Sequence, residues 1–354
     1  MKPQLIHIDP KNIDLNLVKE VASWIREGKI GALPTETVYG LAANLDRQDA
    51  VNRVYLLKKR DKNKPSTIHI ASPEDVDFFL DILPPYGYRL IEKFWPGPLT
   101  IIYYQKDSPQ NIGLRCPSHP VTSLILKEAL CRVIMPSANI SGEPPAVSSE
   151  EIQRIFNGQI DFIVDSLPPS FKVSSTIVDL TLRSPQILRS GAIPEKEIAK
   201  VLDSKRILFV CTGNTCRSIM AQYLLKLYLK KKKPSLAEKI EVLSCGISAS
   251  EGIPPSSEVV GLLLKEGINV SQHTSQRINK HLIRSSDIII VMEKRHRETV
   301  IGMEALAINR IFLMGNFLKD YQDDIPDPIG RPSQYFEEVF YLIKEAIEEI
   351  INWL

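Results

Sequence analysis

Residues 206–233, RILFVCTGNTCRSIMAQYLLKLYLKKKK, place a strand, a loop and a helix in one short stretch. Residues 207–210 are all apolar, which is typical of a buried strand. Apolar side chains then recur at helical spacing from Ile219 to Leu227, so a helix follows the loop. The amides and the positive dipole end of that helix point into the loop that starts at Cys211. This arrangement predicts an anion site.

The loop carries the groups that covalent phosphoryl transfer needs. Gly213 lets the backbone approach an anion closely, and Arg217 can hold two phosphate oxygens with its planar fork. Amides, dipole and arginine together stabilise a thiolate at Cys211, which is a nucleophile toward a bound phosphoryl group. Ser218 can donate its hydroxyl to the sulfur. Asp327, between two prolines, is the candidate acid for the leaving group.

This pattern resembles the low-molecular-weight protein tyrosine phosphatase family over residues 205–354. Cys211, Arg217 and Ser218 match its phosphate loop, and Asp327 with the proline after it matches its general-acid loop. The resemblance implies a parallel sheet flanked by helices, a phosphocysteine intermediate and a phosphoprotein substrate. It also assigns the rest of the loop to binding and shaping around phosphate: Thr212, Gly213, Asn214, Thr215 and Cys216.

Two features of this stretch bear on the substrate. Neither the loop SASEGIPP (248–255) nor the pair that follows Pro328 contains an aromatic residue, although phosphotyrosine-selective members place one there. Thr215 stands where many of them have an aliphatic residue. The loop CTGNTCRS is similar to that of the protein arginine phosphatase branch. Phosphoarginine and phosphotyrosine both stay open as substrates.

The cysteines allow other interpretations. Five cysteines in 354 residues, without a C-x-x-C pair, exclude a disulfide scaffold and predict no metal site. Cys211 alone could be an inert core residue, and Cys211 with Cys216 could form a reversible disulfide. An arsenate reductase on this fold needs more downstream cysteines, and only Cys245 is present. The phosphatase interpretation is favoured because glycine, arginine and aspartate accompany the thiol.

The first half of the chain places polar loops at the ends of apolar runs. Residues 28–72 hold an apolar strand, the turn PTET and a helix that ends in the basic run KKRDKNK, which can bind a polyphosphate. Hydroxyls, amides or an arginine occur in four later loops, where binding residues collect: GLRCPSHP (113–120), MPSANISGEPPA (135–146), SSTIVDL (174–180) and ILRSGAI (187–193). With no candidate nucleophile, the expected chemistry is positioning of two ligands and charge neutralisation.

These motifs, in this order, resemble the YrdC-like threonylcarbamoyl-AMP synthase family over residues 10–195. The resemblance implies a twisted mixed α/β sheet and a reaction of L-threonine, bicarbonate and ATP that releases pyrophosphate, with Mg²⁺ held through phosphate oxygens and water. A partner complex then transfers the threonylcarbamoyl group to tRNA. The matching threonine-site positions are Thr35, His69, Arg115 and Ser175. The matching ATP-side positions are Lys58, Arg60, Ser137, Asn139 and Arg189.

Composition fits two such domains. The chain is 44% hydrophobic and 24% charged, which is typical of globular domains. Its net charge of +2 is small, so no strong electrostatic field attracts it to nucleic acid or membranes. A membrane span and a secretory signal are not expected, and the cytoplasm is the expected compartment. Gly191 and Pro194, followed by a polar stretch, predict a domain boundary within residues 191–205. The expected domains are 1–200 and 205–354.

We therefore expect a bifunctional two-domain α/β enzyme. Two alternatives remain at this point. The first domain could only bind RNA, which would leave the phosphatase as the sole enzyme. The phosphatase domain could instead be a degenerate scaffold.

Overall fold

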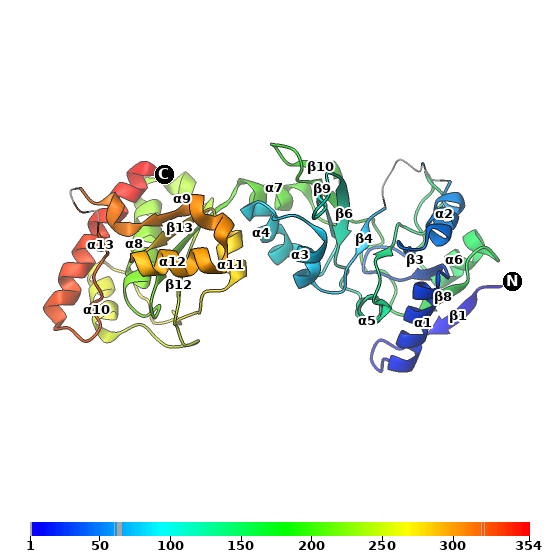
Figure 1. Ribbon diagram of the computed structural model, residues 1–354, viewed down its shortest axis with the longest axis horizontal. Coiled ribbons are helices and arrows are strands. Elements are labelled where there is room, and N and C mark those ends of the chain that lie inside the picture. The colour runs from blue at the N-terminus through cyan, green and yellow to red at the C-terminus, as the bar shows by residue number, and fades with distance from the viewer. Residues whose placement is uncertain (1, 60, 62–65, 320, 322) are drawn as a thin grey trace. The chain divides into compact units, whose positions relative to one another are not determined.

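The chain forms two compact units in a computed structural model that describes residues 2–59, 61, 66–319, 321 and 323–354 (Figure 1). The first unit comprises Met1–Leu83 and Leu90–Leu202, and the second comprises Pro84–Arg89 and Asp203–Leu354. No helix within the described part of the chain has the length and hydropathy that crossing a bilayer requires.

The first unit is built on a mixed sheet, ten-stranded over the described residues, in the order β1-β8-β2-β3-β7-β4-β6-β5-β9-β10. Its strands are β1 (Gln4–His7), β2 (Gly31–Leu33), β3 (Gly40–Asn44), β4 (Ile68–His69), β5 (Leu99–Tyr104), β6 (Asn111–Arg115), β7 (Val133–Ile134), β8 (Phe162–Asp165), β9 (Thr176–Asp179) and β10 (Gln186–Arg189). The helical segments up to residue 203 are α1 (Leu15–Glu27), α2 (Gln48–Leu57), η1 (Pro73–Asp75), α3 (Val76–Phe79), α4 (Pro85–Phe94), α5 (Pro120–Ala129), α6 (Ser149–Phe156) and α7 (Glu195–Asp203).

This sheet contains both parallel and antiparallel strand pairs, which confirms the mixed α/β fold predicted for the first half. Strands β4 and β6 pair in parallel with His69 opposite Arg115. Strands β5 and β9 also pair in parallel, with Leu99 opposite Thr176. These pairings bring the ends of strands that are distant in the sequence close together, and the polar loops begin at these strand ends.

The second unit holds a parallel sheet, four-stranded over the described residues, in the order β12-β11-β13-β14. Its strands are β11 (Lys205–Cys211), β12 (Ile240–Gly246), β13 (Ile288–Val291) and β14 (Ile311–Leu313). Its helical segments are α8 (Arg217–Lys232), α9 (Pro234–Ala237), α10 (Ser257–Lys265), α11 (Lys280–Ser285), α12 (Lys294–Met303), η2 (Ala305–Arg310), η3 (Met314–Phe317) and α13 (Ser333–Trp353). This parallel sheet with flanking helices confirms the fold predicted for the second half.

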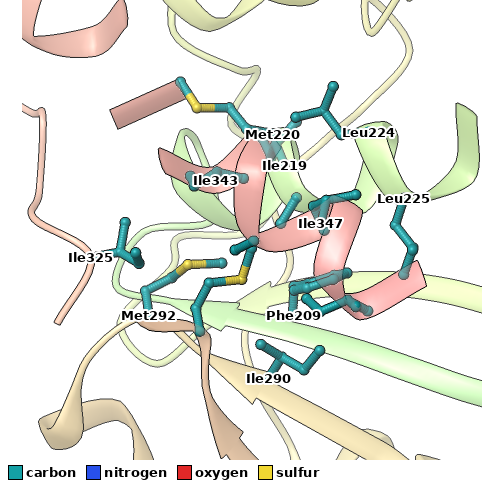
Figure 2. Close-up of a cluster of buried hydrophobic side chains, with 14 of the residues drawn as sticks. Phe209, Ile219, Met220, Leu224, Leu225, Ile290, Met292, Ile325, Ile343 and Ile347 are labelled. Carbon is teal, nitrogen blue, oxygen red and sulfur yellow. The ribbon is translucent and has the colours of Figure 1, made fainter. Parts of the chain in front are cut away.

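Both faces of this sheet are covered, which explains why β11 is apolar at successive positions. Phe209 faces a core cluster to which α8 and α13 contribute, and Leu208 faces a second cluster with residues from α11 and α12. Figure 2 shows the first cluster, in which the labelled side chains are Phe209, Ile219, Met220, Leu224, Leu225, Ile290, Met292, Ile325, Ile343 and Ile347. The core fixes β11 and α8 against each other, so the loop between them is held at the carboxyl edge of the sheet.

Candidate active sites

The predicted nucleophile lies at the end of β11, and the loop 212–216 joins it to α8. The Cys211 sulfur lies 3.0 Å from Ser218 Oγ and accepts a hydrogen bond of 3.2 Å from the Asn214 amide. The side chain is 3% exposed, at the base of the loop. The Ser218 hydroxyl and the Asn214 amide therefore both face the sulfur.

Asn214 shapes the loop. Its φ of +53° lies in the left-handed region, which asparagine adopts more readily than most residues. Its Nδ2 donates to Ser218 Oγ (2.9 Å) and Ser244 Oγ (2.8 Å), and its Oδ1 accepts from the Gln276 amide (2.9 Å). Ser244 in turn donates to Gln222 Oε1 at 2.6 Å. This network, which is buried except at Gln276, stabilises the left-handed residue that turns the loop.

A glycine outside the loop makes room for it. A Cβ on Gly246 would lie 2.5 Å from the Thr212 carbonyl oxygen and 2.8 Å from the Asn214 amide nitrogen, so only glycine fits. A Cβ on Gly213 would meet only Thr215 Oγ1, at an ordinary 3.5 Å. Of these two glycines, Gly246 at the end of β12 is therefore the one that the packing of the loop requires, and the sequence alone did not indicate it.

Arg217 and Asp327 meet although 110 positions separate them. Arg217 is 1% exposed, and its Nη2 donates to Asp327 Oδ2 at 2.5 Å. Its Nη1 donates to Glu293 Oε1 (2.6 Å) and to the Ile325 carbonyl (2.7 Å). Asp327 is 35% exposed and also accepts from the Ile329 amide. The candidate acid is thus anchored beside the loop and reachable from solvent.

The second thiol of the loop differs from the first in its surroundings. All five cysteines are free in the structure, Cys211 and Cys216 included. Burial raises the pKa of Cys216 to about 11, against smaller opposing effects of its hydrogen bonds with Ser256 and Thr215. Cys216 therefore carries its proton at neutral pH and is a poor nucleophile.

In the first unit, a cavity of about 90 Å³ gathers most of the residues expected there. Its lining includes all four positions that match the threonine site: Thr35, His69, Arg115 and Ser175. Arg189, assigned by resemblance to the ATP side, lines this same cavity. Wall residues that the sequence analysis missed include Thr67, Thr100 and Ser174. Thr67 and Ser174 lie shortly before β4 and β9, and Thr100 is the second residue of β5, so only their places near the starts of strands could have indicated them.

Arg115 is held by a buried carboxylate. Its Nη2 donates to Glu36 Oε1 (2.5 Å) and Thr37 Oγ1 (2.8 Å), and the two charged side chains are 6% and 8% exposed. The second Glu36 oxygen accepts from the Ser118 amide at 3.0 Å. Glu36 lies inside the turn PTET, yet sequence alone did not indicate that it pairs with Arg115. The pair fixes the arginine at the cavity.

His69 is neutral in this environment. Burial, reinforced by the charge of Arg115, lowers its pKa to about 3. Its Nδ1 lies 3.2 Å from the Thr67 carbonyl oxygen, which can only accept a hydrogen bond. The hydrogen is therefore on Nδ1, and Nε2 is a hydrogen-bond acceptor.

Ser175 joins β9 to β10 through side-chain contacts. Its hydroxyl lies 2.9 Å from Thr100 Oγ1, and Arg189 donates to its carbonyl (2.8 and 3.0 Å) and hydroxyl (2.9 Å). A Cβ on Gly191 would lie 2.3 Å from the Ser174 carbonyl oxygen, so a glycine at this position lets the two backbone segments lie close together. Because the two segments lie close together, the Arg189 side chain is within hydrogen-bond distance of Ser175.

A second hollow of about 390 Å³ adjoins the first, because Ser137 lines both. It contains Lys58 and Asn139, two further residues matched to the ATP side. Lys58 Nζ donates to the Asn139 carbonyl (2.9 Å), to Asn139 Oδ1 (3.0 Å) and to the Ser137 carbonyl. Arg60, the remaining ATP-side position, lies outside the described residues.

Known protein families match the two halves of the chain separately. The sequence model of the Sua5/YciO/YrdC family, whose description reads "Telomere recombination", matches residues 23–191. The model described as "Low molecular weight phosphotyrosine protein phosphatase" matches residues 206–354.

Individual relatives agree with the first match. The threonylcarbamoyl-AMP synthase of Pyrococcus abyssi is 36% identical over 198 residues, which cover 54% of this chain and 58% of that protein. A putative threonylcarbamoyl-AMP synthase of Mycobacterium tuberculosis is 32% identical over 202 residues, which cover 55% of this chain and 92% of that protein. A solved structure of a double variant of P. abyssi Sua5 aligns with a TM-score of 0.53 and 26% identity, over 88% of this chain and 98% of that chain. This chain spans somewhat more than half the length of the P. abyssi synthase and of its Bacillus subtilis counterpart.

Proposed function

Because this chain belongs to the Sua5/YciO/YrdC family and continues into a low molecular weight phosphatase domain, we propose that it is a bifunctional enzyme. The first unit is an L-threonylcarbamoyladenylate synthase, which uses L-threonine, bicarbonate and ATP. Its product goes to a threonylcarbamoyl transferase complex that modifies tRNA. The second unit is a protein phosphatase with a phosphocysteine intermediate. Both activities take place in the cytoplasm.

The observation that carries the synthase proposal is the pair of adjoining hollows that share Ser137. The small cavity, with Arg115 and neutral His69, suits an amino acid, and the larger one, with Lys58, suits a triphosphate. Threonine and bicarbonate first form a carbamate with loss of water. A carbamate oxygen then attacks the α-phosphorus of ATP, the bond to the β-phosphate breaks, and pyrophosphate leaves. Ser137 lies at the junction, where this attack would take place.

Charge neutralisation is the protein's main contribution to this step. Arg115 and Arg189 line the small cavity, and Lys58 and Lys59 line the larger one, so four cationic side chains among the described residues surround the two hollows. No group of three His, Cys, Asp or Glu side chains among the described residues is arranged to hold a metal ion. We expect Mg²⁺ to arrive with ATP and to bind through phosphate oxygens and water, as it commonly does with nucleotides.

Pyrophosphate release tests the synthase. We expect the full chain to release pyrophosphate only when L-threonine, bicarbonate and ATP are all present, because the attacking group forms from the first two. Omission of each substrate in turn is the control. A folded protein that releases none, yet binds RNA, would favour the alternative in which the first unit is only a binding module.

The phosphatase proposal rests on the contacts around Cys211. The Cys211 thiolate attacks phosphorus while Asp327 gives its proton to the leaving group as the bond between phosphorus and that group breaks. Asp327 then takes a proton from water, which attacks the phosphocysteine and frees phosphate and the thiolate. Ser218 supports the sulfur at 3.0 Å. Arg217 Nη2, which donates to Asp327 in the structure, is the donor that a phosphate oxygen would accept from.

We assign phosphoarginine as the substrate. The loop 248–256 reaches Thr215, since the Ser256 amide donates to the Thr215 carbonyl oxygen at 3.1 Å. Exposed aliphatic residues, Ile253 and Ile329, occupy the two loops in which an aromatic wall for phosphotyrosine would lie. A threonine hydroxyl can accept a hydrogen bond from a guanidinium, whereas an aliphatic side chain cannot.

Substitution of Thr215 by isoleucine tests this substrate. We expect Thr215→Ile to lower hydrolysis of a phosphoarginine peptide about tenfold, which is the effect of one lost hydrogen bond to a charged group. Hydrolysis of the matched phosphotyrosine peptide should change much less, and the ratio of the two kcat/KM values is the measurement. A parent protein that prefers phosphotyrosine would contradict the assignment.

A further inference from the structure

Two arginines beside the phosphate loop share the same two acceptors. Arg217 donates to Glu293 Oε1 (2.6 Å) and Thr212 Oγ1 (3.4 Å). Arg295, in the first turn of α12, donates to the same Glu293 oxygen (3.1 Å) and the same Thr212 oxygen (2.9 Å). Its Nε also donates to Glu293 Oε2 at 2.6 Å. Arg295 is 55% exposed, whereas Arg217 is fully buried.

Glu293 needs a second cation for charge balance. Burial opposes its ionisation, but the hydrogen bonds from Arg295 and Arg217 outweigh this effect, and the pKa of Glu293 lies below its ordinary value. The carboxylate is therefore charged. With Arg217 as its only partner, it would cancel the charge that Arg217 offers to a phosphate. Arg295 neutralises the carboxylate instead.

Thr212 is fixed from the other side by a neutral histidine. Its hydroxyl accepts from both arginines, so its own hydrogen is left for His296 Nε2, which lies 3.0 Å away. Burial lowers the pKa of His296 to about 4, so the ring is uncharged and can accept. The first residue of the phosphate loop is thereby held in one orientation.

We propose that Arg295 is a positioning residue for phosphate binding by the second unit, acting through Glu293 and Thr212. It does so without touching the phosphate. It balances the charge of Glu293, so that the charge of Arg217 acts on the anion, and it holds Thr212 at the start of the loop. This inference rests on the proposed phosphatase function, because the anion it serves is the phosphoryl group.

Phosphate affinity tests the inference. The full chain carrying Cys211→Ser binds inorganic phosphate without turnover, and calorimetry gives the Kd. We expect Arg295→Met in this background to weaken phosphate about tenfold, the scale of a charge-assisted hydrogen bond. Adding Glu293→Gln removes the unbalanced charge and should restore most of the affinity. A merely structural role of Arg295 would not produce this recovery.

A neighbouring lysine supplies the matched control. Lys294 lies one residue before Arg295 and pairs with Asp323 at 3.3 Å, so Lys294→Met removes a positive charge from the same turn without touching Thr212 or Glu293. It should change the Kd less than about twofold, since exposed charges are screened. Three results would overturn the proposal. Arg295→Met and Lys294→Met could lose equal phosphate affinity, the Kd of Arg295→Met could lie within twofold of the parent value, or Glu293→Gln could fail to restore the affinity.

Turnover separates this inference from the proposed function. In the chain with Cys211 intact, Arg295→Met should raise KM and the inhibition constant of phosphate more than it lowers kcat. Thermal unfolding should be unchanged, because the side chain is more than half exposed. If the parent hydrolyses no phosphoprotein, the proposed function fails, while the phosphate affinities still decide the role of Arg295.

Discussion

Replacement of Cys211 by serine is expected to reduce phosphate release by about four orders of magnitude or more, because loss of a covalent nucleophile removes the reaction path itself. A serine hydroxyl at this position faces the same Ser218 hydroxyl and Asn214 amide, but it is a far weaker nucleophile than a thiolate. Phosphate binding should persist, since Arg217 and the loop amides are untouched. The measurement is phosphate release under saturating phosphopeptide.

The control for this variant is a thiol elsewhere in the chain. Cys131→Ser changes a half-buried cysteine of the first unit and should leave phosphate release as in the parent. Substantial phosphate release by Cys211→Ser would sink the phosphocysteine mechanism. A parent protein that binds phosphate but hydrolyses nothing would favour the alternative of a degenerate scaffold.

Replacement of Arg115 by methionine should affect both activity and stability of the first unit. The variant leaves the Glu36 carboxylate buried without its cation, a change that costs about 3–5 kcal/mol. Pyrophosphate release should fall at least about a hundredfold, because the small cavity loses a cation that neutralises its substrate. Calorimetric unfolding of the full chain and the pyrophosphate assay measure the two effects.

A second substitution separates the two effects. Glu36→Gln combined with Arg115→Met replaces the ion pair by neutral side chains of similar size, so most of the stability should return. Activity should stay low, because the cation is still missing. If Arg115→Met alone is as stable as the parent, Arg115 and Glu36 do not form a stabilising buried pair. If the double variant is active, Arg115 is not part of the synthase site.

The sequence predicts local features of the fold well. The apolar run of β11 and the helical spacing in α8 are encoded within a few residues, so the position of Cys211 at the start of the loop between them could be inferred. The threonine-side residues also share one cavity as expected. The resemblance to the synthase family selected these residues, because the polar loops alone indicate only that ligands bind near strand ends.

Long-range pairings could not be predicted in the same way. That β4 lies beside β6, with His69 opposite Arg115, depends on sheet order rather than on local pattern. The same holds for Glu293, which reaches the phosphate loop because β13 is the neighbour of β11. A useful signal existed, since carboxyl ends of parallel strands meet at one edge. Applied to the stretch IIIVMEKRH (288–296), it would have pointed to Glu293 and Arg295.

The contacts of Lys58 have a consequence for the proposed product. Threonylcarbamoyl-AMP is a mixed anhydride, and such compounds acylate free amines. Lys58 is almost fully buried, and its ammonium hydrogens point to three oxygens of the segment 137–139. A nitrogen that donates to three oxygens carries three hydrogens, so it has no lone pair to attack a carbonyl group. With the proposed product bound, the chain would thus keep an amine beside a reactive intermediate without labelling itself.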